Sequence, residues 1–309
     1  MDIDCVIVGG GAAGLSAALV LGRARRRILL VDAGRQSNLS AHGIGGLLGS
    51  DGRPPAELYA AGRAELRAYP TVEVRDGTVV DAVAAEGGFT VELADGARVA
   101  ARRILLATGM EYRPPALPGL SELWGSSVFH CPFCHGWEVR EQPLAVCANG
   151  DRALHSALML RGWSDDVVLL TNGPADLSAD QCEMLTAAGV SIDERNIASL
   201  AGTDGQLTDV VFTDGAPLPR RGLLVSTTLH QRSSLAARLG AEFNPPGPVA
   251  VDALKVDPFC RTTVPGVFAA GDVSAQMPQV AAAVAAGSLA GAAVMQSLLA
   301  EDVGLPIPG

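Results

Sequence analysis

The sequence is short of positive charge and of closely spaced cysteines. Its 23 lysine and arginine residues face 33 aspartates and glutamates, which gives a formal net charge of −10. This shortage argues against nucleic acid and against an anionic membrane surface as partners, because both are bound mainly through basic side chains. Its six cysteines are scattered except for one C-x-x-C pair, so we expect a reducing, cytoplasmic setting.

The sequence also lacks the pattern of a signal peptide. Its first four residues, Met-Asp-Ile-Asp, are acidic and lead directly into an apolar segment that is typical of a strand. The apolar stretch 280–299 is rich in alanine and has no basic flank. We expect a buried helix of a soluble α/β protein there, with a membrane-spanning helix as the lesser alternative. The length of 309 residues predicts two domains, each with its own core.

A dinucleotide-binding fingerprint lies at the start of the chain. An apolar strand at 4–8 is followed by Gly9-x-Gly11-x-x-Gly14 and an apolar helix at 15–21. A second apolar strand at 28–31 then ends in the acid Asp32. The glycines allow a tight turn, a close approach of backbone to pyrophosphate and packing of helix on strand. The helix N-terminus favours phosphate charge, and Asp32 is expected to accept a hydrogen bond from a ribose hydroxyl.

The middle of the chain repeats this pattern in a degraded form. We expect strands at 144–146 and 167–170, with Ala148-x-Gly150-x-x-Ala153 between them, so alanine replaces the first glycine. Thr171 stands where the first unit has its acid, and no arginine cluster follows. An NAD site uses the acid and an NADP site uses arginine at this point. The sequence therefore predicts a second nucleotide-type fold that has lost its pyridine nucleotide site.

Proline-rich stretches at 114–118 and 240–249 predict linkers between the domains. We therefore assign residues 1–113 and 245–309 to one domain that is split in sequence, and residues 114–244 to an inserted domain. Within the first part, 71–106 has glycine-containing turns and predicts short antiparallel strands. The loop 34–55 is rich in glycine and serine, and we expect it to be functional or to cover a ligand.

The last part of the chain contains an apolar strand that ends in Gly271-Asp272, with a helix after Gln279. A carboxylate at this point can hold a chain of sugar-like hydroxyls, and the helix N-terminus can face an electron-rich ring edge. The alternative for Asp272 is a simple helix N-cap.

The closely spaced cysteines are Cys131 and Cys134, with His130 and His135 immediately outside them. Two thiols at this spacing can form a redox-active disulfide, and a histidine can move the proton that thiol chemistry requires. Pro132 predicts a helix start that leaves Cys131 near the helix N-terminus, where a thiolate is favoured. Half of a zinc site and an inert disulfide are the alternatives, and redox chemistry is favoured because the other cysteines are isolated.

Together these motifs resemble the low-molecular-weight thioredoxin reductases over essentially the whole chain. The matching segments are Gly9-x-Gly11-x-x-Gly14, Ala107-Thr108-Gly109, Cys131-x-x-Cys134, Ala270-Gly271-Asp272 and Gln279. The resemblance implies an α/β homodimer with two Rossmann-like, three-layer ββα domains per chain. It implies FAD held by Gly9, Gly11, Gly14, Asp32, Thr108, Gly109, Gly271, Asp272 and Gln279. It also implies that Cys134 faces the flavin and that Cys131 exchanges with the outside sulfur.

The sequence departs from these reductases in two ways. His135 replaces the acid that follows their second cysteine, and the NADPH motifs of the inserted domain are degraded. This pattern resembles the FAD-dependent dithiol oxidases of gliotoxin and holomycin biosynthesis. It implies oxidation of a holomycin-like dithiol to its disulfide, with dioxygen as acceptor and hydrogen peroxide as product. His135 is expected to be a base, and His130 is either a second base or a structural histidine. The alternatives are a reductase fed by NADPH or ferredoxin, and a protein that binds dithiols without turnover.

Overall fold

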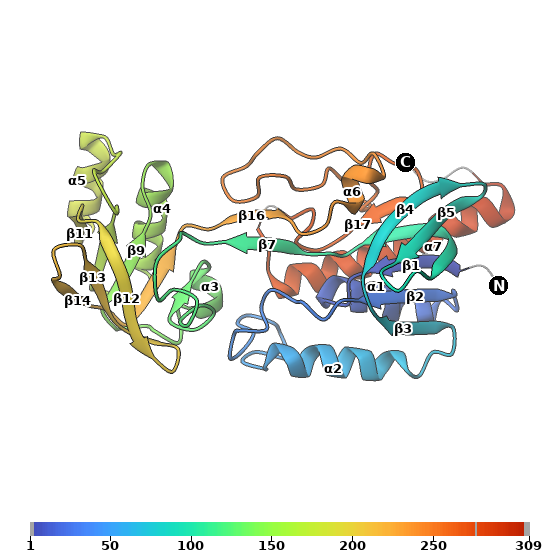
Figure 1. Cartoon of the computed structure of the whole chain (residues 1–309), viewed down its shortest axis with the longest axis horizontal. Coiled ribbons are helices and arrows are strands. Elements are labelled where there is room, and N and C mark those ends of the chain that lie inside the picture. Colours follow the sequence, from blue (N-terminus) through green and yellow to red (C-terminus); the bar gives the residue numbers. More distant parts are fainter. Residues whose placement is uncertain (1–2, 276, 306–309) are drawn as a thin grey trace. The chain divides into compact units, whose positions relative to one another are not determined.

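The computed structural model describes residues 3–275 and 277–305 (Figure 1). Met1 and Asp2 of the acidic N-terminus lie outside the described residues. The chain divides into two compact units: Met1–Leu39, Pro54–Tyr112 and Leu229–Gly309 form the first, and Ser40–Arg53 and Arg113–Thr228 form the second. The chain crosses one residue before the boundary expected at 113. The structure differs from the expected division in two places, because 40–53 belongs to the second unit and the chain returns to the first unit at Leu229.

The first unit is built on a seven-stranded sheet with the order β3-β2-β1-β6-β5-β4 and with β17 beside β6. Its strands are β1 (Ile3–Val8), β2 (Ile28–Asp32), β3 (Val72–Asp76), β4 (Val79–Ala85), β5 (Gly88–Leu93), β6 (Arg98–Leu106) and β17 (Val267–Ala269). The pairs β4–β5 and β5–β6 are antiparallel, and the other pairs are parallel. The antiparallel segment is therefore shorter than the 71–106 expected, because β3 pairs in parallel with β2.

Alternate residues of β1 face two different cores. Cys5 and Ile7 pack in a cluster that includes residues of α1 (Ala12–Arg23) and α7 (Val280–Val303), whereas Val6 and Val8 pack in a cluster that includes β5. A strand covered on both faces is apolar throughout, which explains the unbroken apolar run of β1.

The long helices of the first unit are α1, α2 (Pro55–Leu66) and α7, and α6 (Leu235–Arg238) is short. α1 packs against α7 so closely that a Cβ on Gly287 would lie 2.1 Å from the carbonyl oxygen of Ala13. α7 is long and apolar enough to cross a membrane by length and composition alone. The buried core helix of a soluble protein meets the same criteria, and the packing of α7 on α1 is of that kind.

The second unit contains a parallel five-stranded sheet with the order β11-β10-β9-β15-β8. These strands are β8 (Val128–Phe129), β9 (Leu144–Cys147), β10 (Val167–Leu170), β11 (Val190–Asp193) and β15 (Gly222–Val225). A three-stranded antiparallel sheet contains β12 (Ile197–Thr203), β13 (Gln206–Phe212) and β14 (Pro217–Pro219). The helices are α3 (Pro132–His135), α4 (Asp151–Leu160) and α5 (Ala179–Ala187). The β9-α4-β10 segment is the second nucleotide-type fold that the sequence predicts.

Two strands carry the chain between the units. β7 (Met110–Arg113) and β16 (Thr228–Gln231) pair in a separate two-stranded sheet, and each contains one of the later crossings.

Candidate functional site

The glycine turn after β1 forms the first part of a candidate FAD site. A Cβ on Gly9 would lie 2.2 Å from the carbonyl oxygen of Ala107, and a Cβ on Gly14 would lie 1.8 Å from that of Gly9. Neither position therefore admits a side chain. A Cβ on Gly11 would meet only the Gln36 side chain, at 3.8 Å, so the turn is open where the backbone can approach a pyrophosphate.

Asp32 is buried at the end of β2 and accepts several hydrogen bonds. The backbone N–H groups of Gly10 and Gly34 each donate to it at 3.1 Å. The side chains of Gln36 and Arg63 donate at 3.1 and 2.6 Å. Burial raises the pKa of Asp32, but the hydrogen bonds from Arg63, Gly34 and Gly10 and the charge of Arg63 outweigh it and hold the pKa below the ordinary value. Asp32 is therefore ionised, and its oxygens already accept five hydrogen bonds from the protein; sequence reasoning missed Gln36 and Arg63, which donate three of them.

Asp272 lies in the turn after β17 and is half-buried. Burial raises its pKa, while a hydrogen bond from the Tyr112 hydroxyl, at 2.9 Å, and the positive charge of Arg232 act against that rise. The N-cap of α7 is Gln279, so the alternative role of Asp272 as the cap of that helix is wrong. A carboxylate that accepts from the Tyr112 hydroxyl through Oδ2 retains lone pairs for a ligand hydroxyl.

The predicted cofactor residues gather at one edge of the first sheet. The glycine turn, Thr108-Gly109 and Gly271-Asp272 follow the carboxyl ends of β1, β6 and β17, which are parallel neighbours. Ligands of parallel α/β sheets bind at this edge. The open glycine turn, the ionised Asp32 and the half-buried Asp272 fit the pyrophosphate and the hydroxyl groups of FAD.

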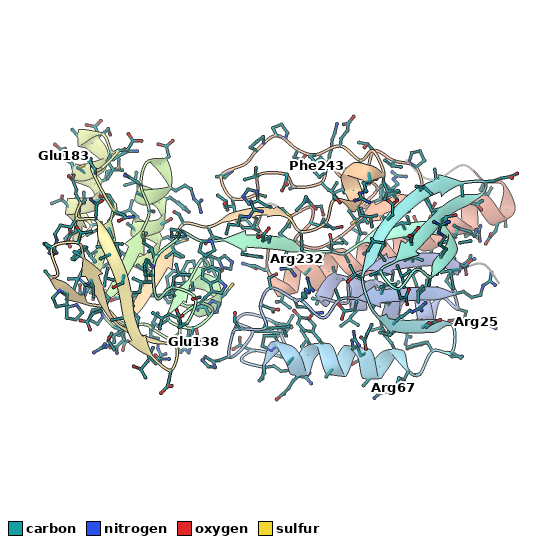
Figure 2. The ribbon with its side chains drawn as sticks, in the orientation of Figure 1. Arg25, Arg67, Glu138, Glu183, Arg232 and Phe243 are labelled. Atoms are coloured by element: carbon teal, nitrogen blue, oxygen red, sulfur yellow. The ribbon has the colours of Figure 1, made fainter. Side chains whose placement is uncertain are left out.

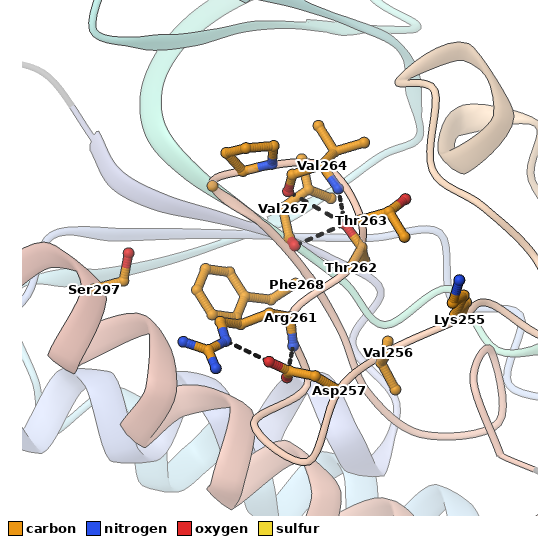
Figure 3. A pocket seen from close by; sticks show the side chains of 12 residues that line it. Lys255, Val256, Asp257, Arg261, Thr262, Thr263, Val264, Val267, Phe268 and Ser297 are labelled. Carbon is orange, nitrogen blue, oxygen red and sulfur yellow. Dashed lines mark hydrogen bonds and ion pairs between the residues drawn. The ribbon is translucent and has the colours of Figure 1, made fainter. Parts of the chain in front are cut away.

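A pocket lies at the opposite, amino edge of the same sheet (Figure 3). It is lined by the segment that leads into β17 and by Ser297 of α7. Arg261 donates to Asp257 at 2.5 Å, and Lys255 pairs with Glu242 at 2.9 Å. Acids of the protein neutralise these cations. The pocket is therefore a weaker candidate for binding pyrophosphate than the glycine turn is.

The cysteine pair lies in the second unit, around the start of α3. Cys131 is the N-cap residue and Pro132 follows it at the first helical position, as the sequence predicts. Both cysteines are thiols in the structure. A hydrogen bond from the Cys134 thiol lowers the pKa of Cys131; burial opposes this, and the backbone N–H groups of Phe133 and Cys134 add to it. Cys131 is therefore favoured as the nucleophilic sulfur. Among the described residues, no group of three or more acids, histidines or cysteines could hold a metal ion.

The two histidines beside the cysteines are held by aromatic rings. His135 stacks on Phe129 and His130 on Trp124, each with ring centroids 5.7 Å apart. Burial lowers the pKa of His135 although the charge of Glu138 opposes it, and burial together with His135 lowers the pKa of His130 to about 4. Both rings are therefore neutral near pH 7. The two ring nitrogens of His135 are buried.

The loop 40–53 belongs to the second unit and reaches the cysteine segment. A Cβ on Gly45 would lie 2.8 Å from the carbonyl oxygen of Cys134, so only glycine allows this approach. His42 of the same loop is close enough for its charge to act on His135. The sequence marks this loop as functional, but its glycine-rich composition gives no indication of its partner.

The degraded nucleotide turn of the second unit carries side chains that bond to a neighbouring loop or add negative charge. The amide of Asn149 accepts the backbone N–H of Asp176 at 2.8 Å and donates to the carbonyl of Pro174 at 2.9 Å. Asp151 places a carboxylate in the first turn of α4. Thr171 is buried and donates to the carbonyl of Gly173 at 2.6 Å. The second unit therefore lacks both features of the first: its turn carries a carboxylate that repels phosphate, and an uncharged threonine stands in place of the ionised acid.

Comparisons with known proteins agree with this architecture. Thioredoxin reductase tcpT of Claviceps purpurea (strain 20.1) is 34% identical, over 97% of this chain and 95% of that protein. Among solved structures, an oxidoreductase from Agrobacterium tumefaciens is 41% identical with a TM-score of 0.91, over 97% of this chain and 99% of that one. The structure of HlmI is 37% identical with a TM-score of 0.91, over 98% of this chain and 94% of that one.

The expected resemblance to thioredoxin reductases and the expected α/β fold with Rossmann-like units are thus confirmed. FAD is the cofactor of this fold, and the carboxyl edge of the first sheet suits it. Residues 3–287 match the pyridine nucleotide-disulphide oxidoreductase family, and the chain belongs to that family.

Proposed function

We propose that the protein is an FAD-dependent dithiol oxidase that closes an intramolecular disulfide in a small, holomycin-like dithiol, with dioxygen as the electron acceptor. The observation that carries this proposal is the degraded nucleotide turn of the second unit. Asn149 ties this turn to the loop after β10 and Asp151 opposes a dinucleotide phosphate, while the cysteine pair in the same unit retains a reactive sulfur. Electrons that cannot enter from NADPH are expected to enter from a thiol substrate.

The cysteines and His135 provide the steps at sulfur. In the oxidised enzyme Cys131 and Cys134 form a disulfide. His135 takes the proton of one substrate thiol, and the resulting thiolate attacks the Sγ of Cys131 and displaces the Cys134 thiolate. The second substrate thiol then attacks the substrate sulfur of the mixed disulfide, its proton passes to the released Cys131 sulfur, and the substrate leaves as a cyclic disulfide. FAD held at the carboxyl edge of the first sheet would supply the redox chemistry by which the electron pair and two protons of the cysteine dithiol reach dioxygen, so each dithiol would yield one hydrogen peroxide.

Oxygen consumption by the yellow holoenzyme tests the proposal. Small dithiols that can close a ring, with dithiothreitol as the simplest, are incubated aerobically with the protein, and dissolved oxygen and peroxide are followed. We expect sustained uptake of one dioxygen per dithiol and an equal yield of peroxide, with glutathione as a monothiol control that reacts more slowly. Absence of uptake with every dithiol of a broad panel, while FAD stays bound, would contradict the proposal.

A second candidate is a reductase that passes electrons to a thioredoxin-like protein. The curated relatives favour it, because the proteins of Claviceps purpurea and Aspergillus oryzae are both named thioredoxin reductases. A reductase would receive its electrons from NADPH or ferredoxin, whereas the oxidase receives them from a dithiol. Which of these compounds reduces the flavin therefore distinguishes the two candidates. Sustained peroxide production would exclude the remaining alternative, a protein that binds dithiols without turnover.

His135→Gln is expected to lower kcat/KM for the dithiol by about 10²-fold at pH 7, because a positioned base contributes at least that much. The pKa of His135 is lowered, so the ring is neutral above that pKa and gains a proton below it. Wild-type activity should therefore fall as the pH drops through this pKa, and the variant should lack that fall. His155→Gln, on the exposed side of α4, is the matched control. A wild-type rate and pH profile in His135→Gln would remove the residue from the mechanism.

A further inference from the structure

The largest aromatic side chains of this protein gather around the cysteine pair. Aromatic residues make up only 4% of the chain, with three tryptophans among them. All three tryptophans lie in this part of the second unit: Trp124 stacks on His130, Trp163 lies edge-on to Phe133, and Trp137 closely follows the second cysteine. A chain that is poor in aromatic residues therefore has its largest ones beside its reactive sulfurs.

Two of these rings face solvent. Phe133 is 61% exposed and Trp137 is 65% exposed, and among the residues that the structure describes they are the exposed aromatic side chains. Phe133 stands between the two cysteines, so its Cα atom is at most about 7.6 Å from that of Cys131. Exposed apolar side chains that lie together on a soluble protein are typical of a binding surface. These two lie next to the sulfur that a substrate attacks.

The protein holds both rings in place without a ligand. Phe133 packs against the edge of Trp163, with ring centroids 5.4 Å apart. Trp163 in turn lies against Gly136, where a Cβ would come within 2.9 Å of the indole ring. The guanidinium of Arg140 lies 3.8 Å from the ring centroid of Trp137 and donates to the carbonyl of the same residue at 2.7 Å. Rings that are already fixed lose little entropy when a ligand binds to them.

The charges around the two rings favour an uncharged ligand. Glu138, labelled in Figure 2, is exposed and directly follows Trp137, and its charge acts on His135. A carboxylate at this place repels an anionic substrate. Arg140 is already engaged with the ring and the carbonyl of Trp137, so it compensates little. The surface beside the cysteines therefore suits a flat and apolar group.

We propose that Phe133 and Trp137 are specificity-determining residues, which stack on a flat, unsaturated and uncharged ring of the substrate while its thiols reach Cys131. This inference rests on the proposed function for the chemistry at sulfur, and it names the class of dithiol that the site selects. Aromatic rings attract one another beyond the effect of the area that they bury, whereas a saturated group gains from burial alone. Because Phe133 is so close to Cys131, the ring must carry the thiols directly or on short arms.

Binding of unreactive thioethers tests this recognition without turnover. The ligands are the S-methylated forms of 1,2-benzenedimethanethiol, of its cyclohexane analogue and of butane-1,4-dithiol, which have the same number of carbons between the sulfurs. We expect the benzene compound to bind the holoenzyme about tenfold more tightly than either saturated one, as measured by isothermal titration calorimetry. Trp137→Leu and Phe133→Leu should each remove most of this preference. Trp137→Phe, which keeps a ring, should retain it.

Oxygen uptake with the free dithiols separates this inference from the oxidase activity. In Trp137→Leu the ratio of kcat/KM for the benzene dithiol to that for the butane dithiol should fall correspondingly, mainly through KM. A thioether preference without any oxygen uptake would remove the oxidase and support the recognition. Equal affinities of the three thioethers for the wild type, or an unchanged preference in both leucine variants, would overturn the inference. A defect of these variants that is confined to exchange with reduced thioredoxin would also overturn it, because the rings would then serve a protein partner.

Discussion

Cys131→Ser and Cys134→Ser are each expected to reduce dithiol oxidation by about 10³-fold or more, because residues that act as one catalytic unit lose nearly all activity when one is removed. Cys131 receives the substrate sulfur, and Cys134 must leave and later restore the disulfide. A serine oxygen can do neither. FAD should remain bound, because its candidate residues lie in the first unit and the cysteines lie in the second. Oxygen uptake and flavin absorbance of the two purified variants measure both outcomes.

The two cysteine variants should also differ from each other. When the cyclic disulfide product is added, Cys134→Ser should form a mixed disulfide through Cys131, whereas Cys131→Ser should form little. In the first variant a serine hydroxyl replaces the Cys134 thiol as donor, and the backbone N–H groups of Phe133 and of residue 134 still favour the Cys131 thiolate. Intact-protein mass spectrometry detects the adduct. Cys182→Ser on α5 is the control, and full oxidation activity in either active-site variant would refute the scheme.

Anaerobic mixing with NADPH or NADH is expected to leave the flavin yellow, whereas a substrate dithiol bleaches it within a turnover. The physical reason lies in the second unit. The Asn149 amide ties the loop after β10 to the nucleotide turn, and the Asp151 carboxylate opposes the phosphates of a dinucleotide. Thr171 lacks the carboxylate charge of the acid that accepts from a ribose, and it is buried with its hydroxyl directed to the carbonyl of Gly173.

Stopped-flow absorbance of the flavin measures this second result. Dithionite should bleach the same sample, which shows that the bound flavin is reducible, and admission of air should restore the colour with release of peroxide. Reduced ferredoxin is a further arm of the experiment and tests the other donor of a reductase. Rapid bleaching by NADPH would establish the reductase in place of the oxidase.

The sequence by itself determined the elements whose interactions are local. The strand, glycine turn, helix and acid of β1-α1-β2 follow one another within a short segment, and each residue type is required by the backbone of its own turn. The same is true of Cys131, since Pro132 beside it starts α3 and makes Cys131 the N-cap residue. The loss of the second nucleotide turn was also visible, because the replaced residues occupy fixed positions in a repeated pattern.

Only the tertiary structure decided which distant segments complete the site. Arg63 reaches Asp32 from α2, Gly45 meets Cys134 from a loop far earlier in the chain, and Gln231 holds the backbone beside Asp272. The strand β3 likewise joins the parallel part of the sheet, although its sequence resembles that of its antiparallel neighbours. Such pairs depend on how whole elements pack, and the pattern of residues along one segment does not specify the segment that packs against it.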